Sequence, residues 1–205
     1  RALIMGGYTG SGFLNDIDYK SIMTAGDALD FGDHLGTRYQ HSACSDGVRV
    51  VSFCSGAPMG TVMEYGTIAR LGDTASFGDN FVTKGRLGGS SDGSRGLALG
   101  GAGPPGYLAP IEYFPVGRLG GSSDFGDLST GRGYVKSVSD GNKCFTTGGH
   151  PGPGSTIDFV IFQTLGNAVD WGETIASKSS VAGGSSGSRA VWGGGTPATD
   201  DIQYF

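Results

Sequence analysis

Charged residues are scarce in this sequence, and long apolar runs are absent. Asp, Glu, Lys and Arg make up 16% of the 205 residues, and the formal net charge is −5, whereas charged residues usually make up ~25% of a chain. A nucleic-acid-binding protein carries a strong basic patch, so this charge argues against a nucleic-acid partner. No apolar run approaches the ~18 residues needed to cross a bilayer, so we expect no membrane insertion.

Cysteine is also rare, with three residues, Cys44, Cys54 and Cys144. An odd number cannot pair completely within one chain. A Cys44–Cys54 disulfide stays open but is not favoured, because a hairpin around Asp46-Gly47 would place Cys44 opposite Arg49. We interpret the cysteines as buried free thiols that act as small apolar side chains. No Cys-x-x-Cys motif or Cys/His cluster indicates a metal, and we expect no cofactor.

Glycine, in contrast, is abundant, with 41 residues. Much glycine and little charge is compatible with disorder, but disordered chains usually also have few aromatic and β-branched residues. This chain has 11 Phe, 8 Tyr and 2 Trp, and its glycines are periodic rather than clustered. The composition therefore predicts an all-β protein of many short strands joined by tight turns.

An aromatic-Gly-acid triplet recurs along the chain at spacings of 46, 48 and 46 residues. Its copies begin at Phe31, Phe77, Phe125 and Trp171. Alignment on this triplet gives four full units, 1–48, 49–94, 95–142 and 143–188, and a partial fifth, 189–205. Each full unit offers about four strands and ends in a turn such as Ser-Asp-Gly, which suits a tight hairpin. Four strands in about 47 residues, repeated, are typical of a propeller blade.

The unit resembles the kelch repeat in "RALIMGGYTGSGFLNDIDYKSI" followed by "TRYQHSACSDG". The phrases "GDALDFGD" and "LGNAVDWGE" are similar to kelch-like repeats in tail-fibre and other virion proteins of bacteriophages. The resemblance implies one kelch-like β-propeller domain over residues 1–205. A five-bladed ring is the simplest closure, while a fragment of a larger ring, or a ring completed by another chain, stays open.

The resemblance also implies the order of strands within a blade. The "SACS" strand would be innermost, the Gly-Gly strand second, the Tyr strand third and the triplet strand outermost. Blade 1 would then lack its inner strand and blade 5 its outer one. Exposed strand edges favour association, so we expect homo-oligomers to be accessible to this chain.

The recurring side chains have a structural interpretation. The acids of the triplets are Asp33, Asp79, Asp127 and Glu173, and a basic row follows them at Arg38, Lys84, Arg132 and Lys178. We predict ion pairs between these rows, within or between blades, rather than a ring of cations for an anionic ligand. The four aromatic residues are expected to pack between stacked blades.

Function is then expected where the units differ, in the loops after the Gly-Gly strands. The candidates are Tyr8, Phe13, Asn15, Asp16 and Tyr107. Aromatic faces could cover a sugar ring while amide and carboxylate groups bind its hydroxyls, although ordinary loop packing and Asx turns explain the same residues. His34, His41 and His150 share no spacing, so we interpret them as surface or loop residues rather than ligands.

Together these features predict a non-enzymatic binding or structural module. The resemblance implies a phage virion or tail-fibre-type protein that recognises a host-surface glycan or joins other virion proteins. It would be located in the virion or outside the cell, and no signal peptide is visible. The alternative is a cellular kelch-type adaptor for proteins. An enzyme ranks last, because no Gly-x-Ser-x-Gly elbow is found. A carbohydrate-active enzyme stays open through the acid pairs Asp200-Asp201 and Asp16/Asp18, although Asp18 belongs to a repeat column.

Overall fold

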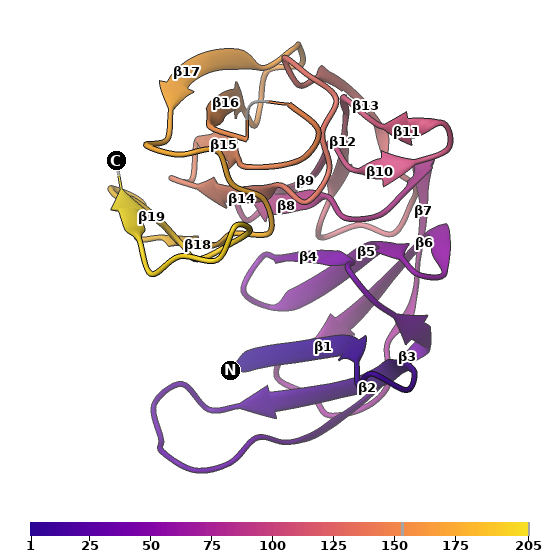
Figure 1. Cartoon of the computed structure of the whole chain (residues 1–205). Coiled ribbons are helices and arrows are strands. Elements are labelled where there is room, and N and C mark those ends of the chain that lie inside the picture. Colours follow the sequence, from indigo (N-terminus) through magenta and orange to yellow (C-terminus); the bar gives the residue numbers. More distant parts are fainter. Residues whose placement is uncertain (153, 205) are drawn as a thin grey trace.

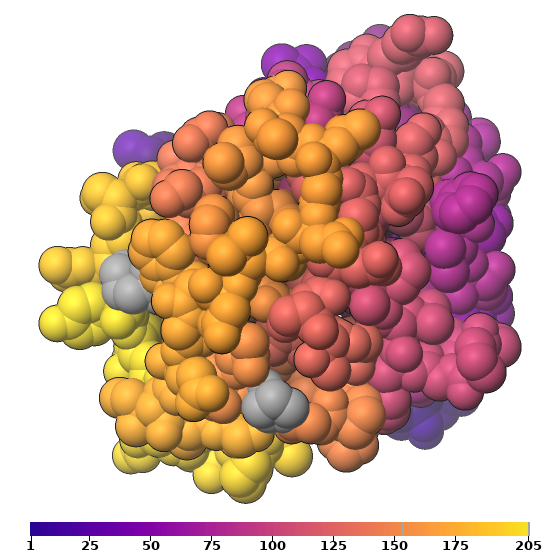
Figure 2. Space-filling view, turned by 90° about the horizontal axis from the view of Figure 1, so that it is seen from above, coloured from indigo at the N-terminus to yellow at the C-terminus, as the bar shows by residue number. Residues whose placement is uncertain are grey.

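The fold is a five-bladed β-propeller, shown by a computed structural model that describes residues 1–152 and 154–204. Five small antiparallel sheets follow one another around a ring, and both chain ends lie on the same side of the view in Figure 1. Figure 2 shows the C-terminal blades in orange and yellow beside the magenta blade 3, with the indigo N-terminal segment largely behind them. The prediction of an all-β propeller is thus confirmed.

Blades 2 to 4 each contain a sheet of four strands. Blade 2 consists of β4 (Ser42–Ser45), β5 (Arg49–Gly56), β6 (Met59–Thr67) and β7 (Ala75–Lys84). Blade 3 consists of β8 (Gly88–Ser91), β9 (Arg95–Leu99), β12 (Pro110–Pro115) and β13 (Ser123–Asp127), with a small hairpin of β10 (Ala102–Gly103) and β11 (Gly106–Tyr107). Blade 4 consists of β14 (Lys136–Ser139), β15 (Lys143–Thr147), β16 (Thr156–Ile161) and β17 (Val169–Glu173).

Blades 1 and 5 have three strands each within the described residues. Blade 1 consists of β1 (Ala2–Tyr8), β2 (Phe13–Lys20) and β3 (Leu29–Arg38). Blade 5 consists of β18 (Ala182–Ser185), β19 (Ala190–Gly193) and β20 (Ile202–Tyr204). The strand order expected from the sequence is confirmed, because blade 2 runs β4-β5-β6-β7 from the inner "SACS" strand to the outer triplet strand.

The core consists of apolar clusters between neighbouring blades. Along β5, Val51 and Phe53 belong to a cluster that also contains Ala98 and Phe114 of blade 3. Because strand side chains alternate between the two faces, the side chains between them on β5 point back toward blade 1. Further clusters join blade 3 to blade 4 and blade 4 to blade 5. Each blade therefore has a front face toward the next blade and a rear face toward the preceding one.

The triplet aromatics fill these contacts where a following blade covers them. Phe31, Phe77 and Phe125 are only 2–3% exposed, which confirms their predicted packing role. Trp171 is 47% exposed, because the three strands of blade 5 cover less of it. It contacts Phe145 and Phe159 of its own blade.

The triplet glycines let the next blade approach the backbone. Gly78 has a φ of +155°, and a Cβ added there would overlap the Gly120 carbonyl group of blade 3. The flanking carbonyls of Phe77 and Asp79 accept hydrogen bonds from the amides of Gly120 and Ser122, at 2.9 and 3.0 Å. The junctions between blades 1 and 2, between blades 2 and 3 and between blades 3 and 4 share this arrangement. The triplet is therefore a structural joint between blades.

None of the described residues forms a helix that is long and apolar enough to span a membrane.

Candidate functional site

The basic row pairs with acids of the following blade and not with the acids of the triplets. The ion pairs are Arg38–Glu64, Lys84–Glu112 at 3.1 Å, Arg132–Asp158 at 2.9 Å and Lys178–Asp201 at 3.1 Å. The predicted partners, Asp33, Asp79, Asp127 and Glu173, have exposed side chains instead. The pairing predicted for the triplet acids is therefore wrong. The true partners in the next blade are Glu64, Glu112 and Asp158 on its third strand, and Asp201 directly before β20.

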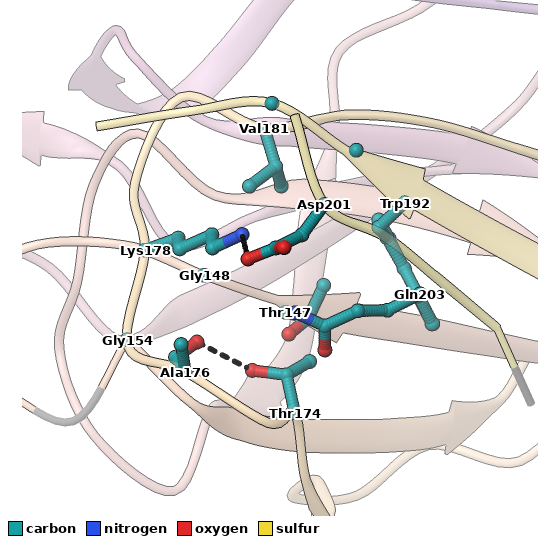
Figure 3. Close-up of a pocket in the computed structure, with 12 residues that line it drawn as sticks. Thr147, Gly148, Gly154, Thr174, Ala176, Lys178, Val181, Trp192, Asp201 and Gln203 are labelled. Atoms are coloured by element: carbon teal, nitrogen blue, oxygen red, sulfur yellow. Dashed lines mark hydrogen bonds and ion pairs between the residues drawn. The ribbon is translucent and has the colours of Figure 1, made fainter. Parts of the chain in front are cut away.

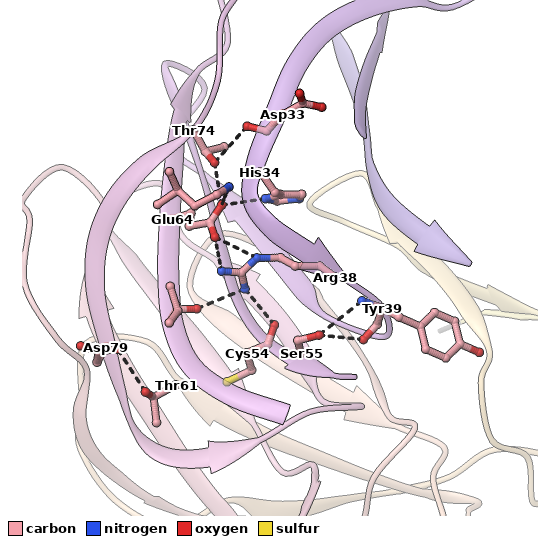
Figure 4. A network of polar contacts seen from close by, with 12 residues as sticks. Asp33, His34, Arg38, Tyr39, Cys54, Ser55, Thr61, Glu64, Thr74 and Asp79 are labelled. Atoms are coloured by element: carbon pink, nitrogen blue, oxygen red, sulfur yellow. Dashed lines mark hydrogen bonds and ion pairs between the residues drawn. The ribbon is translucent and has the colours of Figure 1, made fainter. Parts of the chain in front are cut away.

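Glu64 is the centre of the most extensive of these junctions (Figure 4). Its Oε1 accepts from Arg38, and its Oε2 accepts from Thr74 Oγ1 at 2.6 Å and from the Leu35 amide at 3.1 Å. His34 Nδ1 lies 2.9 Å from the same Oε2. Arg38 also donates to the Cys54 carbonyl at 3.3 Å. Glu64, Arg38 and His34 are all buried, so the carboxylate is held between two blades with little access to solvent.

Two of the three histidines are interior residues, contrary to the expectation from their irregular spacing. His34 contacts Glu64, and its ring packs edge-on against His41 at a centroid distance of 5.4 Å. Burial lowers the pKa of His41 to about 3, helped by the nearby His34 and Arg38. Burial alone would raise the pKa of Glu64, but hydrogen bonds from His34, Thr74 and Arg38 outweigh it and lower that pKa to about 2. Only His150 is exposed.

We expect acidification to destabilise the protein first through His41. In the unfolded chain this histidine binds a proton below its usual pKa of 6.5, whereas in the fold it stays neutral down to about pH 3. Stability is therefore lost as pH falls below 6.5, by about 2 kcal/mol between pH 7 and pH 5. A second loss follows below the usual Glu64 pKa of 4.5, because protonation removes a buried carboxylate that the fold favours.

Urea unfolding at pH 7 and pH 5 measures the first loss. His41→Gln should show a smaller difference between the two pH values than the parent chain. An equal difference in both proteins would contradict the assignment to His41.

A second basic row also has a structural role. Arg1, Arg49 and Arg95 each lie over a tyrosine of their own blade, with 4.6–4.7 Å from the guanidinium carbon to the ring centroid. Each also donates to a backbone carbonyl of the next blade, at 2.9, 3.2 and 2.6 Å respectively. These arginine side chains thus already contact groups of their own and the next blade. This supports the interpretation that the basic residues do not form a ring for an anionic ligand.

The end of the propeller with the second-to-third-strand loops carries the side chains that differ most. Each basic residue of the first row is followed by two residues that connect it to the inner strand of the next blade. The second members are Gln40, Arg86, Tyr134 and Ser180, all with φ between +54° and +59°. Their backbones form a ladder in which each amide bonds to the preceding member's carbonyl, at 2.5–3.0 Å. Non-glycine residues in this conformation are strained and often mark functional regions.

Side chains of this ladder also contact one another. Arg86 Nε donates to Gln40 Oε1 at 2.7 Å, and the guanidinium lies 5.3 Å from the Tyr134 ring centroid. All three are partly buried. This arrangement presents amide, guanidinium and phenol groups around one end of the ring.

Tyr8 and Phe13, both predicted from the sequence, form an aromatic cluster with Tyr39 at this end. The three ring centroids lie 5.5–5.7 Å apart, and the Phe13 and Tyr39 rings are stacked. Tyr8 and Phe13 are direct cross-strand partners, and the Tyr8 hydroxyl donates to the Gly10 carbonyl at 2.7 Å. Tyr8 is 53% and Phe13 41% exposed, so the cluster is open to solvent.

Tyr39 joins this cluster from the neighbouring blade junction. Its carbonyl accepts from the Gly56 amide at 2.7 Å and from Ser55 Oγ at 3.1 Å. The cluster therefore lies on two blades, with backbone bonds on either side holding the rings in place. We call Tyr8, Phe13 and Tyr39 the aromatic platform.

The other predicted loop residues take no part in the ring contacts of the platform. Tyr107 belongs to the equivalent loop of blade 3, where its ring is 5.2 Å from that of His150. Asp16 is exposed within β2 and pairs across the sheet with Asp33, while Asn15 is partly buried on the same strand. The five candidates thus do not form one site. The sequence interpretation missed Tyr39 and Gln40, although variation in the two positions after the basic row signals them.

Two further hollows are less suited to a ligand. One lies between blades 4 and 5 and has a volume of only about 10 Å³. Its lining includes the Lys178–Asp201 ion pair and the hydrogen bond from Thr174 to Ala176 (Figure 3). The other, of about 440 Å³, is lined by serines and glycines of the inner strands and turns of blades 3 to 5. Its Asp92 and Asp140 carboxylates already accept bonds from the amides of their own turns.

The three cysteines are buried thiols, and the described residues include no metal-binding cluster. All three thiols are free and buried, as the sequence favours, and burial raises the pKa of Cys54 and of Cys144 to about 12. No group of three or more His, Cys, Asp or Glu in residues 1–152 and 154–204 has the arrangement needed to hold a metal ion.

Comparison with models of known protein families and with curated protein sequences gives no match. The β-propeller fold fits a binding or structural module, and the kelch-like and phage resemblances remain proposals.

Proposed function

We propose that this chain is a non-enzymatic, glycan-binding propeller of the phage tail-fibre or virion type, and that the aromatic platform carries the ligand. The observation that supports this most is the platform itself. Two rings exposed by 41% and 53% and a third ring fixed at a blade junction form a continuous apolar surface at one end of the ring. Exposed aromatic side chains of this kind bind partners at low entropic cost, because they have few rotatable bonds.

The polar groups beside the platform fit the same ligand class. Gln40 follows Tyr39 directly and offers an amide that is already oriented by Arg86. Amide and guanidinium groups at the edge of an apolar surface can bind hydroxyls that the rings do not cover. The net charge of −5 favours neutral or basic glycans over strongly anionic ones.

We expect Tyr8→Ala to weaken glycan binding by at least about tenfold, because truncating an aromatic anchor removes the covering surface. Phe13→Ala should have a similar effect. The measurement is an array of bacterial surface glycans probed with the multivalent protein, followed by titration of the glycans that bind. Tyr107→Ala is the matched control, since this tyrosine occupies the equivalent loop of blade 3.

Binding by the parent chain that Tyr107→Ala reduces as much as Tyr8→Ala would contradict the platform as the site. Absence of any bound glycan at high avidity would remove the glycan-binding role. The remaining proposal would then be assembly with other virion proteins, for which the open faces of blades 1 and 5 provide the surface.

A further inference from the structure

The rear face of each of blades 2 to 4 is a receptor for one basic side chain. In blade 2, Arg38 reaches the Glu64 carboxylate and the Val62 carbonyl, the latter at 3.2 Å. In blade 3, Lys84 reaches Glu112 at 3.1 Å and the Pro110 carbonyl at 2.9 Å. In blade 4, Arg132 reaches Asp158 at 2.9 Å and the Thr156 carbonyl at 2.8 Å. The receptor is thus an acid with a carbonyl two residues before it, on the third strand.

Blade 1 presents the same receptor on its rear face. In the alignment of units, Asp18 occupies the position of Glu64, and Asp16 occupies that of Val62. Asp18 is exposed, and no ion pair connects it to a base among the described residues. The side chain of Ile4 beside it is 56% exposed, whereas its counterparts Ser52 and Ala98 are fully buried.

The front face of blade 5 also has exposed apolar side chains. Val191 is 39%, Ile202 74% and Tyr204 69% exposed. The counterparts of Val191 and Ile202 on the front face of blade 2, Val51 and Met63, are fully buried, and Tyr65, the counterpart of Tyr204, is partly buried. No pair of strands from blades 1 and 5 packs together to the extent seen between the other neighbouring blades. The ring therefore has one open side, bounded by the rear of blade 1 and the front of blade 5.

The connectivity of the repeat defines what fits this open side. Each outer strand leads directly into the inner strand of the next blade, as β3 leads into β4 and β13 into β14. β20 and β1 each pair with one strand only within the described residues. One segment with an outer strand and then an inner strand would add to the edge of β20 and to the edge of β1.

We propose that the open side binds a polypeptide segment of the repeat's own pattern, supplied from outside residues 1–205, and that Asp18 receives its basic residue. The segment carries an aromatic-Gly-acid triplet and an Arg or Lys seven residues after the aromatic, the spacing found in all four units. Its aromatic covers the front of blade 5. Its base reaches Asp18 and the Asp16 carbonyl, as Arg132 reaches Asp158 and the Thr156 carbonyl.

A synthetic peptide of residues 117–142 is the probe, because it contains Phe125, Gly126 and Arg132 and supplies the arginine that already pairs with an aspartate. Fluorescence anisotropy of the labelled peptide, titrated with the whole chain, measures binding. The peptide with Arg132→Ala should bind at least about tenfold more weakly, since the charge pair is lost. In the chain, Asp18→Asn should weaken the parent peptide similarly, and Ile4→Arg should abolish its binding.

Asp127→Asn in the chain is the matched control, because it neutralises an exposed acid away from the open side and should leave binding unchanged. Asp18 and Ile4 are exposed, so both variants should keep the parent's unfolding midpoint, which is checked by circular dichroism. The proposal is overturned if the peptide does not bind, or if Arg132→Ala and Asp18→Asn bind like the parents. It is also overturned if sedimentation shows copies of the chain pairing through Ile4, since the occupant is then a second copy.

Discussion

Glu64→Ala is expected to lower the free energy of unfolding by about 3–5 kcal/mol, because it leaves the buried Arg38 guanidinium without its partner. The same change removes the acceptor for His34, Leu35 and Thr74, so several buried donors lose their bonds together. The contact joins blades 1 and 2, and its loss should also loosen their packing. Urea unfolding at pH 7, followed by tryptophan fluorescence and circular dichroism, measures the change.

Asp33→Ala is the control that distinguishes the ion pair seen in the structure from the one predicted from the sequence. Asp33 is an exposed triplet acid on the strand that also carries Arg38. Its replacement should change stability by less than about 0.5 kcal/mol, as for ordinary surface substitutions. If Asp33→Ala proves as destabilising as Glu64→Ala, the triplet acids do pair with the basic row and the junction described above is incorrect.

The second large effect is expected at the triplet glycine of blade 2. Gly78→Ala should destabilise the protein by several kcal/mol, on the order of 3, from two sources. The backbone at a φ of +155° is unfavourable for any residue with a Cβ, and that Cβ would overlap the Gly120 carbonyl group of blade 3. Thermal and urea unfolding both report the loss.

Gly172→Ala is the matched comparison in the same repeat position. Gly172 has a similar φ of +137°, but no atom lies within 4 Å of an added Cβ. Only the backbone strain then remains, about 1–2 kcal/mol. Equal losses in the two variants would show that the close approach of the next blade contributes nothing, and that the triplet glycine serves backbone conformation alone.

The sequence allows the fold to be predicted because its units repeat at nearly constant spacing. The period, the four short strands per unit and the Ser-Asp-Gly turns all agree with one architecture, and the structure confirms the strand order. The burial of Phe31, Phe77 and Phe125 follows from the same regularity, since each ring meets an equivalent neighbour. The exposed Trp171 departs from it because blade 5 has three strands within the described residues.

The partners of the basic row could not be chosen from the sequence. Two acid columns recur with the same period, one at Asp33 and one at Glu64, and only their orientation distinguishes them. The pairing of β6 with β7 shifts in register between Met63 and Glu64, so simple alternation does not carry across this point. A register shift changes which face a side chain occupies, and no local residue pattern marks it here.

The aromatic platform was predictable only in part, for a related reason. Tyr8 and Phe13 were recognisable because their loop differs from those of other units. Tyr39 is distant in sequence and belongs to the segment between blades, and the ring geometry alone brings it to them. Tyr107 was grouped with Tyr8 because their loops are equivalent, yet equivalent loops of blades 1 and 3 lie at different positions around the ring.

We expect the recurring residues to stabilise the blades, whereas the loops that differ between units bind the ligand. Mapping a bound glycan on the folded protein tests this expectation most directly. Backbone amide spectra would be recorded during titration with the glycan that binds most tightly on the array. We predict the largest shifts at Tyr8, Phe13 and Tyr39 and in the loop of residues 9–12. Shifts centred instead on the Ser-Asp-Gly turns at Asp92 and Asp140, or on the recurring ion pairs, would contradict the account.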